Sequence, residues 1–292
     1  MAEPGRTAAD ATAADGVETA DALAVAREAA ADAVQVILAA RGRRREITAK
    51  RPRDFVTDAD RAAEERIVER LIRAFPGHAI VAEESAEESV NGGKRKRSAG
   101  GNRYRWIIDP LDGTTNFVHG FPAYAVSIAL YEGDAPRAAL VVDPLRGEWF
   151  AARAGEGARL DGGDPADGRD LAVTDPVDPN QRLVATGFPF RHPEQIERYL
   201  AAFRALFERV GDMRRAGSAA LDLAYVAAGR VDGFWELGLN LWDIAAGELL
   251  VLEAGGRVSD WVGGAAHRQT GWVAAGGPNV HAMLVETLTE HA

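Results

Sequence analysis

Two carboxylates at the end of an apolar run are the first feature of this sequence that suggests chemistry. Asp109 and Asp112 follow the run that begins at Trp106, and Pro110 fixes the backbone between them. Gly113 then permits a tight turn, after which backbone N–H groups can bind an anion. Carboxylate oxygens and N–H groups together form a place for a hard cation and a phosphate. The structural alternative is an Asp-Pro-x-Asp-Gly turn with aspartate caps.

The residues around these aspartates offer further ligands. The Leu111 carbonyl is another oxygen for the cation, and the N–H groups of Gly113 and Thr114 suit a phosphate. Thr114 and Thr115 can also open a helix directly after the turn. The sequence therefore predicts a strand, a turn and a helix start at this candidate centre.

Three other segments place acids at the ends of predicted elements. Glu83 follows a short apolar strand, and taken alone it is most simply a surface acid. Asp243 stands at a helix start, where an N-cap is the simplest explanation. Thr57 and Asp60 have the spacing of a capping box. Each segment alone is weak evidence for a functional site, so its role depends on which residues the fold brings together.

The apolar periodicity predicts the elements that must position these acids. In the first part of the chain we expect helices at 19–40 and 58–75, strands at 79–82, 106–108, 124–131, 137–142 and 148–152, and a hairpin at 155–163. In the second part we expect strands at 182–186 and 233–236, and helices at 194–210, 218–228 and 242–254. This alternation of strands and helices predicts α/β layering.

Composition divides the chain into three parts. Residues 1–18 are rich in Ala, Asp and Thr, and we expect them to form a mobile tail. The Pro- and Asp-rich segment 174–180 is the expected boundary between an N-terminal α+β half (19–178) and a C-terminal α/β half (179–292). With 292 residues, the chain is long enough to bury a substantial core.

The overall charge and the lack of cysteine exclude several classes of protein. The chain has 34 Lys+Arg against 44 Asp+Glu, a net charge of −10, whereas a general binder of nucleic acids or anionic membranes needs a basic excess. The absence of cysteine excludes disulfide scaffolds, Cys-ligated zinc, iron–sulfur clusters and thiol catalysis. No segment has the pattern of a signal peptide or a membrane span, so we expect a cytoplasmic protein.

Several other patterns in the sequence look functional at first but lack the residues that their functions need. The basic tetrad at 94–97 lies in the hydrophilic stretch 86–104, and we interpret it as part of a solvated loop rather than a phosphate or RNA patch, because no aromatic residues interleave with it. The segment 155–163 lacks the third glycine of a dinucleotide loop. Ser218 lies outside a G-x-S-x-G motif, no Walker A motif occurs, and the histidines form no H-x-x-x-H pair.

Taken together, the acidic segments resemble the inositol monophosphatase family of magnesium-dependent, lithium-sensitive phosphatases. The resemblance runs from about residue 20 to the C-terminus. Its motifs are AEES at 82–85, DPLDGTTNFVHGFP at 109–122, TGFPFR at 186–191, DMRRAGSAALDLAYVAAGRVDGFWE at 212–236 and LWDIAAGELLVLEAGG at 241–256. The third and fourth of these segments are similar to the bacterial SuhB-type branch of the family.

The resemblance implies a metal centre with two or three Mg²⁺ ions. Glu83, Asp109 and the Leu111 carbonyl would hold the first ion. Asp109, Asp112 and Asp243 would hold the second. The N-terminal half would thus supply most of the ligands, and the site would lie between the two halves.

The resemblance also implies catalytic and substrate-binding residues. Thr114, in a network with Asp60, would orient the attacking water, and Glu83 would take part in catalysis. The implied substrate contacts are Gly113, Thr114, Gly217, Ser218, Ala219, Glu236, Asp243 and, by a looser match, Lys50.

The activity implied by the resemblance is Mg²⁺-dependent hydrolysis of inositol 1-phosphate by a metal-activated water, without a covalent phosphoenzyme. A relaxed sugar phosphatase that also accepts fructose 1,6-bisphosphate is an alternative. A second alternative is a SuhB-type factor in transcription antitermination and ribosomal RNA biogenesis, which binds RNA polymerase and Nus factors rather than a specific nucleic acid sequence. The implied fold is a five-layered αβαβα sandwich, usually found as a homodimer.

Overall fold

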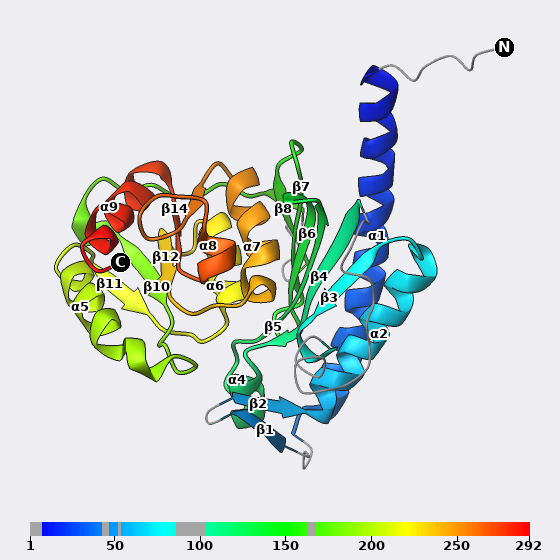
Figure 1. Cartoon of the computed structure of the whole chain (residues 1–292), viewed down its shortest axis with the longest axis horizontal. Coiled ribbons are helices and arrows are strands. Elements are labelled where there is room, and N and C mark those ends of the chain that lie inside the picture. The colour runs from blue at the N-terminus through cyan, green and yellow to red at the C-terminus, as the bar shows by residue number, and fades with distance from the viewer. Residues whose placement is uncertain (1–7, 43–46, 52–53, 86–102, 163–167) are drawn as a thin grey trace.

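The structure of this chain is a computed structural model. It describes residues 8–42, 47–51, 54–85, 103–162 and 168–292, with the side chains of 8–20, 47–51 and 54–56 left out of that description. Figure 1 shows five layers in the order helices, sheet, helices, sheet, helices. The mixed α/β architecture that the sequence predicts is confirmed, and the order of the layers is that of an αβαβα sandwich.

The first sheet has seven strands in the order β3-β4-β5-β6-β7-β8-β9. They are β3 (Ala79–Ala82), β4 (Tyr104–Asp112), β5 (Ala125–Glu132), β6 (Ala135–Asp143), β7 (Glu148–Arg153), β8 (Ala158–Asp161) and β9 (Arg169–Asp170). Only the β3–β4 pair is parallel among these described strands. Consecutive residues of β4 face opposite sides, so Ile107 and Ile108 belong to different buried clusters. Both faces of the sheet are therefore covered, which explains the nearly continuous apolar runs of its central strands.

Two helices cover the outer face of this sheet (Figure 1). They are α1 (Ala8–Ala40) and α2 (Asp58–Ala74). Small buried residues such as Ala26 and Ala30 of α1 pack with Ile67 and Leu71 of α2 in one core. The helix α1 begins at Ala8 rather than at residue 19, so residues 8–18 are helical and not the tail predicted from composition. Alanine has the highest intrinsic helix propensity, which favours this extension of the helix.

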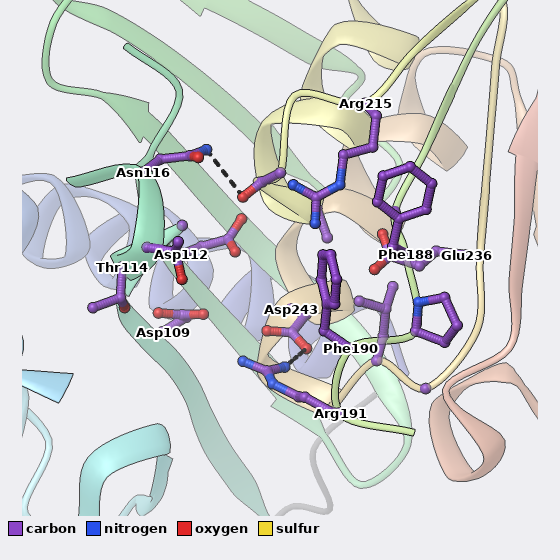
Figure 2. Close-up of a pocket in the computed structure, with 18 of the residues that line it drawn as sticks. Asp109, Asp112, Thr114, Asn116, Phe188, Phe190, Arg191, Arg215, Glu236 and Asp243 are labelled. Atoms are coloured by element: carbon purple, nitrogen blue, oxygen red, sulfur yellow. Dashed lines mark hydrogen bonds and ion pairs between the residues drawn. The ribbon is translucent and has the colours of Figure 1, made fainter. Parts of the chain in front are cut away.

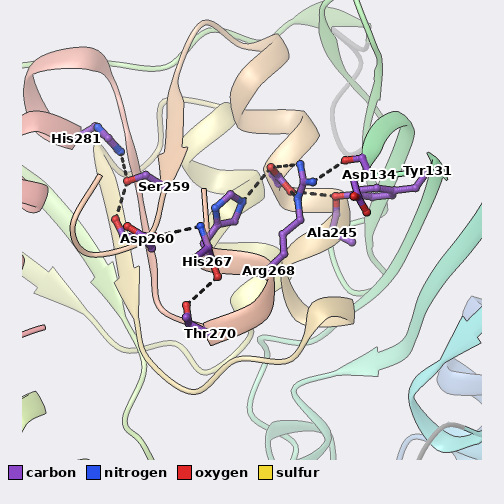
Figure 3. A network of polar contacts seen from close by, with 11 residues as sticks. Tyr131, Asp134, Ala245, Ser259, Asp260, His267, Arg268, Thr270 and His281 are labelled. Carbon is purple, nitrogen blue, oxygen red and sulfur yellow. Dashed lines mark hydrogen bonds and ion pairs between the residues drawn. The ribbon is translucent and has the colours of Figure 1, made fainter. Parts of the chain in front are cut away.

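The middle layer contains α6 (Ala219–Ala227) and α7 (Leu241–Glu253), whose apolar residues pack in one core with the inner faces of both sheets. A polar network also fastens α7 to the seven-stranded sheet (Figure 3). Glu248 of α7 accepts a hydrogen bond from the Tyr131 hydroxyl of β5 at 3.0 Å and two from Arg268 at 2.7 Å each. The Nε2 atom of His267 lies 3.0 Å from the same carboxylate. Burial alone would raise the pKa of Glu248, but the bonds from His267 and Arg268 lower that pKa to about 2.

The second sheet has five strands in the order β11-β10-β12-β14-β13. They are β10 (Leu183–Thr186), β11 (Asp212–Arg214), β12 (Gly233–Glu236), β13 (Arg257–Ser259) and β14 (Val273–Gly276). Its outer face packs against α5 (Ile196–Phe207) and α9 (Pro278–Thr289), with Tyr199 and Trp235 stacked in the core between them. The smaller elements are β1 (Ile47–Arg51), β2 (Asp54–Thr57), α4 (Thr114–His119), α8 (His267–Thr270) and the 3₁₀ turns Pro179–Gln181 and Pro193–Gln195.

Most predicted elements are present, with shifted ends. The predicted strand 106–108 is the centre of a longer β4. A hairpin is present near 155–163, but its first strand is β7, which ends at Arg153, and only its second strand, β8, lies within the predicted range. The predicted helix 194–210 is shorter, because a 3₁₀ turn precedes α5. Most of the stretch 86–104, including the tetrad 94–97, lies outside the described residues. Among the helices that are described, none is long and apolar enough to cross a membrane.

Candidate active site

The carboxyl ends of β3 and β4 bring two predicted acids together. The strands are parallel, and Ala82 is opposite Ile108. The residues that follow, Glu83 and Asp109, therefore come side by side at one edge of the sheet, and both are buried. Neighbouring strand ends thus join two segments that are 26 residues apart in the sequence.

An irregularity in β4 turns its two aspartates toward the same pocket. In a regular strand, residues three apart point to opposite faces of the sheet. The pairing of β4 with β5 shifts register between Asp109 and Asp112, around Pro110, which has no N–H to donate. Asp109 is fixed further by the Leu111 N–H, which donates to its Oδ1 at 3.0 Å. Both carboxylates consequently line one pocket (Figure 2).

The third aspartate comes from the start of α7. Asn240 caps this helix, and Asp243 accepts the backbone N–H of Asn240 on its Oδ2 at 2.7 Å. The two residues form a capping box, so the simple expectation that Asp243 itself is the N-cap is wrong. A carboxylate in this position is favoured by the positive end of the helix dipole and is held in one orientation.

Asp109, Asp112 and Asp243 form a compact cluster of buried carboxylates. One oxygen from each lies within 4.8 Å of the others. Burial, then the charges of Glu83, Asp112 and Asp243, raise the pKa of Asp109 well above its usual value. Burial and the charge of Asp243 raise the pKa of Asp112 to about 7. Buried like charges are costly without a cation, and an all-oxygen set suits a hard divalent ion, so these residues fit a metal.

Asp112 also connects β4 to α6 in the other part of the fold. Its Oδ2 accepts hydrogen bonds from the Ser218 hydroxyl at 2.6 Å and from the Ala220 N–H at 2.8 Å. Ser218 is the N-cap of α6. These bonds orient the Asp112 carboxylate and fix the start of α6 at the end of β4, so the cluster depends on the docking of the two sheets through the middle layer.

Thr114 connects the glycine turn to α2. Its hydroxyl lies 2.8 Å from Asp60 Oδ1 and 3.1 Å from the Leu111 carbonyl. Asp60 is 1% exposed, and its Oδ2 accepts the Thr57 N–H at 2.9 Å, which confirms the predicted capping box. With its proton directed to Asp60, the Thr114 hydroxyl offers its lone pairs to a donor such as water.

Two glycine turns from distant parts of the chain pack against each other beside the cluster. Gly113 has φ +88°, and a Cβ there would lie 2.8 Å from the Ala123 carbonyl oxygen. Gly217 has φ +89° and lies next to the side-chain amide of Asn116. That amide donates to the Ala123 carbonyl at 2.6 Å and to the Ala216 carbonyl at 2.8 Å. Only glycine meets both the left-handed backbone and the close approach at residue 113.

The pocket next to the cluster has a volume of about 400 Å³. Glu236, at the end of β12, lines the pocket on the side of the five-stranded sheet, and its carboxyl lies against the backbone of Gly187. Burial, then the charge of Asp243, raise the pKa of Glu236 to about 8. The opposite walls therefore offer carboxylates for a cation on one side and a hydrogen-bonding acid on the other (Figure 2).

Most of the predicted site residues line this pocket, and two of the described ones lie behind it. The residues that line it are Glu83, Asp109, Leu111, Asp112, Gly113, Thr114, Gly217, Ala219, Glu236 and Asp243. Asp60 and Ser218 lie behind the lining, where they bond to Thr114 and Asp112. Lys50 belongs to β1, whose side chains lie outside the described part of the chain.

The sequence reasoning missed several residues of the pocket. Arg215 lies over the rings of Phe188 and Phe190, 5.1 and 5.3 Å from their centroids (Figure 2). Arg191 reaches Asp243, and Asn116 bonds the two glycine turns. These residues stand inside the motifs quoted above, but no spacing marks them, because each acts on a partner that is remote in the sequence.

Comparisons with known proteins show which family and which solved structures this chain is similar to. The model of the inositol monophosphatase family matches residues 18–292. A curated relative, the Nus factor SuhB of Pseudomonas aeruginosa, is 47% identical over 248 residues, which cover 84% of this chain and 86% of the relative. The structure of extragenic suppressor protein suhB from Bartonella henselae matches with a TM-score of 0.83 at 36% identity, over 92% of this chain and 99% of that chain. An inositol monophosphatase structure from Anabaena matches with a TM-score of 0.76 at 36% identity, over 92% of this chain and 95% of that chain.

Proposed function

We propose that this chain, which belongs to the inositol monophosphatase family and is a phosphatase, hydrolyses inositol 1-phosphate to myo-inositol and phosphate with Mg²⁺. The observation that carries the proposal is the buried cluster of Asp109, Asp112 and Asp243 beside the Gly113 turn. The cluster supports cation binding, and the adjoining pocket has the size for a single phosphorylated ring.

The proposed metal ligands come from three elements of the fold. Glu83, Asp109 and the Leu111 carbonyl would hold one ion, and Asp109, Asp112 and Asp243 would hold a second, in a centre of two or three Mg²⁺. When bound, such ions lower the pKa of a coordinated water and stabilise the leaving alkoxide. The buried carboxylates provide the fixed oxygen positions that this chemistry needs.

Residues of the chain itself would orient the attacking water. The Thr114 hydroxyl donates its proton in a hydrogen bond to Asp60 and accepts a hydrogen bond from the water, which would turn a lone pair of the water oxygen toward phosphorus. Asp60 keeps this orientation because the capping box with Thr57 holds its second oxygen. Glu83, which also borders the pocket, is the carboxylate that we assign to receive the water proton.

The substrate would lie across the pocket from the cluster. We assign the phosphate to the backbone N–H groups of Gly113 and Thr114, and the ring hydroxyls to Glu236. Gly217 and Ala219 border the side on which the alcohol leaves. Three predicted contacts remain. Asp243 borders the pocket and is also assigned to the metal, Ser218 acts through Asp112, and Lys50 rests on the family resemblance alone.

The central experiment measures phosphate release from inositol 1-phosphate with and without Mg²⁺. Asp109→Asn keeps the size of the side chain but removes a charged ligand, so we expect kcat to fall by at least about a hundredfold. Asp134→Asn is the matched control, because the Asp134 side chain is 97% exposed. Circular dichroism should show that both variants are folded. Near-full activity of Asp109→Asn would show that the metal assignment is wrong.

A panel of substrates tests the choice of inositol 1-phosphate. Fructose 1,6-bisphosphate, histidinol phosphate and adenosine 3′,5′-bisphosphate are the informative competitors. We expect the highest kcat/KM for inositol 1-phosphate, with inhibition by Li⁺. A comparable kcat/KM for fructose 1,6-bisphosphate would favour the relaxed sugar phosphatase instead.

The identity to proteins named Nus factor SuhB favours a second function. We propose that this chain also binds RNA polymerase together with Nus factors, as a homodimer in the cytoplasm. With a net charge of −10, this binding would be to protein partners rather than directly to RNA. A pull-down with purified polymerase and Nus factors tests it, using Asp109→Asn to separate binding from catalysis. Retention of no partner by either form would contradict this second function.

A further inference from the structure

Arg191 forms ion pairs with two of the proposed metal ligands. Its Nη1 lies 3.2 Å from Asp243 Oδ2, and its Nη2 lies 3.9 Å from Glu83 Oε1. Figure 2 shows the guanidinium turned toward Asp243 from the segment that also carries Phe190. One side chain of the segment between β10 and α5 thus bridges an acid that follows β3 and an acid of α7.

The guanidinium and a cation would draw on the same carboxylate group. Asp243 Oδ2 already accepts the Asn240 N–H at 2.7 Å, and the Arg191 Nη1 donates to it as well. Two positive charges within about 4 Å of each other repel strongly where little water screens them, and both carboxylates are at most 5% exposed. A cation bound to the Asp243 carboxylate and the Arg191 guanidinium therefore repel each other, and each weakens the binding of the other.

The Arg191 guanidinium is also able to move away from the two carboxylates. Its side chain lines the pocket and is 32% exposed, so it is partly accessible to solvent. The backbone before it is held by short-range bonds, with the Phe190 N–H donating to the Phe188 carbonyl at 2.8 Å. Displacement of the guanidinium then requires rotation of a long side chain, with no change in the sheets.

We propose that Arg191 competes with the divalent cation for Asp243 and Glu83, and thereby sets the cation concentration at which the centre fills. A planar guanidinium is suited to this role, because its fork spans two carboxylates that a single ammonium group does not bridge. The inference rests on the metal centre proposed above, but it concerns binding and not turnover.

Metal titrations of the purified chain test the competition without substrate. Tb³⁺ is a hard, oxygen-seeking probe, and Trp242 next to Asp243 can sensitise its luminescence; calorimetry with Mg²⁺ provides the second titration. We expect Arg191→Gln to bind both ions about tenfold more tightly, which corresponds to about 1.4 kcal/mol. Arg191→Lys should lie between the wild type and Arg191→Gln. Arg204→Gln, on the exposed side of α5, is the matched loss of charge and should leave both affinities unchanged.

The outcomes separate this inference from the proposed function. Equal affinities of Arg191→Gln and Arg204→Gln, or weaker binding by Arg191→Gln, would overturn the competition even if the enzyme hydrolyses inositol 1-phosphate. If the wild type binds neither ion and Asp109→Asn behaves in the same way, the metal centre and the inference fail together. Tighter binding by Arg191→Gln supports the inference whatever the substrate is.

Nuclear magnetic resonance gives a direct readout of the side chain. The Arg191 Nε–Hε signal, assigned by its loss in Arg191→Lys, should shift on saturation with Mg²⁺, and its exchange with water should become faster. An unchanged signal at saturating Mg²⁺ would show that the guanidinium does not move, which would also refute the competition.

Discussion

Replacing Glu248 with glutamine removes one negative charge from the network that joins α7 to the seven-stranded sheet. Glu248 is 2% exposed, and its carboxylate contacts Tyr131, His267 and Arg268. The same helix carries Asp243 five residues earlier, about 1.4 turns, so the network also holds a proposed metal ligand in place. The change preserves the size of the side chain, removes the charge and replaces one acceptor oxygen with an NH2 donor, and only the contribution of the charge depends on pH.

The magnitude follows from the pKa of Glu248. The hydrogen bonds lower this pKa from 4.5 to about 2, a difference of about 2.5 pH units that corresponds to about 3 kcal/mol. Because the pKa in the folded state is lower than in the unfolded state, this stability is fully present above pH 4.5. It is lost as the pH falls from 4.5 toward 2, where the folded protein also takes up the proton.

Urea unfolding of the wild type and Glu248→Gln at several pH values measures this contribution. We expect the free energy of unfolding to differ by about 3 kcal/mol at pH 7 and by about 1 kcal/mol at pH 3. Other carboxylates that titrate over this range are common to both proteins and largely cancel in the difference. A difference that stays constant from pH 7 to pH 3 would refute the assignment of the charge to this network.

Glu286→Gln is the matched control for this experiment. Glu286 is 69% exposed and pairs with Arg209 at 2.9 Å on the surface of α9. Exposed ion pairs contribute about 0–1 kcal/mol, so we expect little loss of stability and little dependence on pH. If Glu286→Gln lost as much free energy of unfolding as Glu248→Gln, burial of the ion pair would not explain the contribution of Glu248.

Three further substitutions test the packing of the site. Gly113→Ala places a Cβ 2.8 Å from a carbonyl oxygen at φ +88°, so we expect a loss of about 1–3 kcal/mol in thermal unfolding and a lower kcat; Gly133→Ala, also at positive φ but with no atom within 4 Å, should cost less. Asn116→Ala removes the bonds between the two glycine turns and should reduce kcat/KM about tenfold in phosphate release, with a loss of about 1–2 kcal/mol. Ser218→Ala removes both a helix cap and a donor to Asp112, and chemical denaturation should show a loss of about 1–2 kcal/mol. Unchanged stability in all three would contradict the described packing.

Local signals in the sequence predicted much of the site. The capping box of Thr57 and Asp60 and the turn at Gly113 follow from residues within three or four positions of each other. Most helices and strands were predicted from apolar periodicity, with errors at their ends. The predicted start of α1 was wrong, because a composition typical of a tail is also compatible with an alanine-rich helix.

By itself, then, the sequence determined which residue types were available and where short elements begin and turn, because hydrogen bonds of caps and turns form between close neighbours in the chain. Only the tertiary structure decided that Glu83 adjoins Asp109, since this depends on the parallel pairing of β3 with β4. It also decided that the β4 irregularity turns Asp109 and Asp112 to one side, and that Arg191 meets Asp243 across 52 positions. Contacts of this kind depend on how whole layers pack, and no local spacing encodes them.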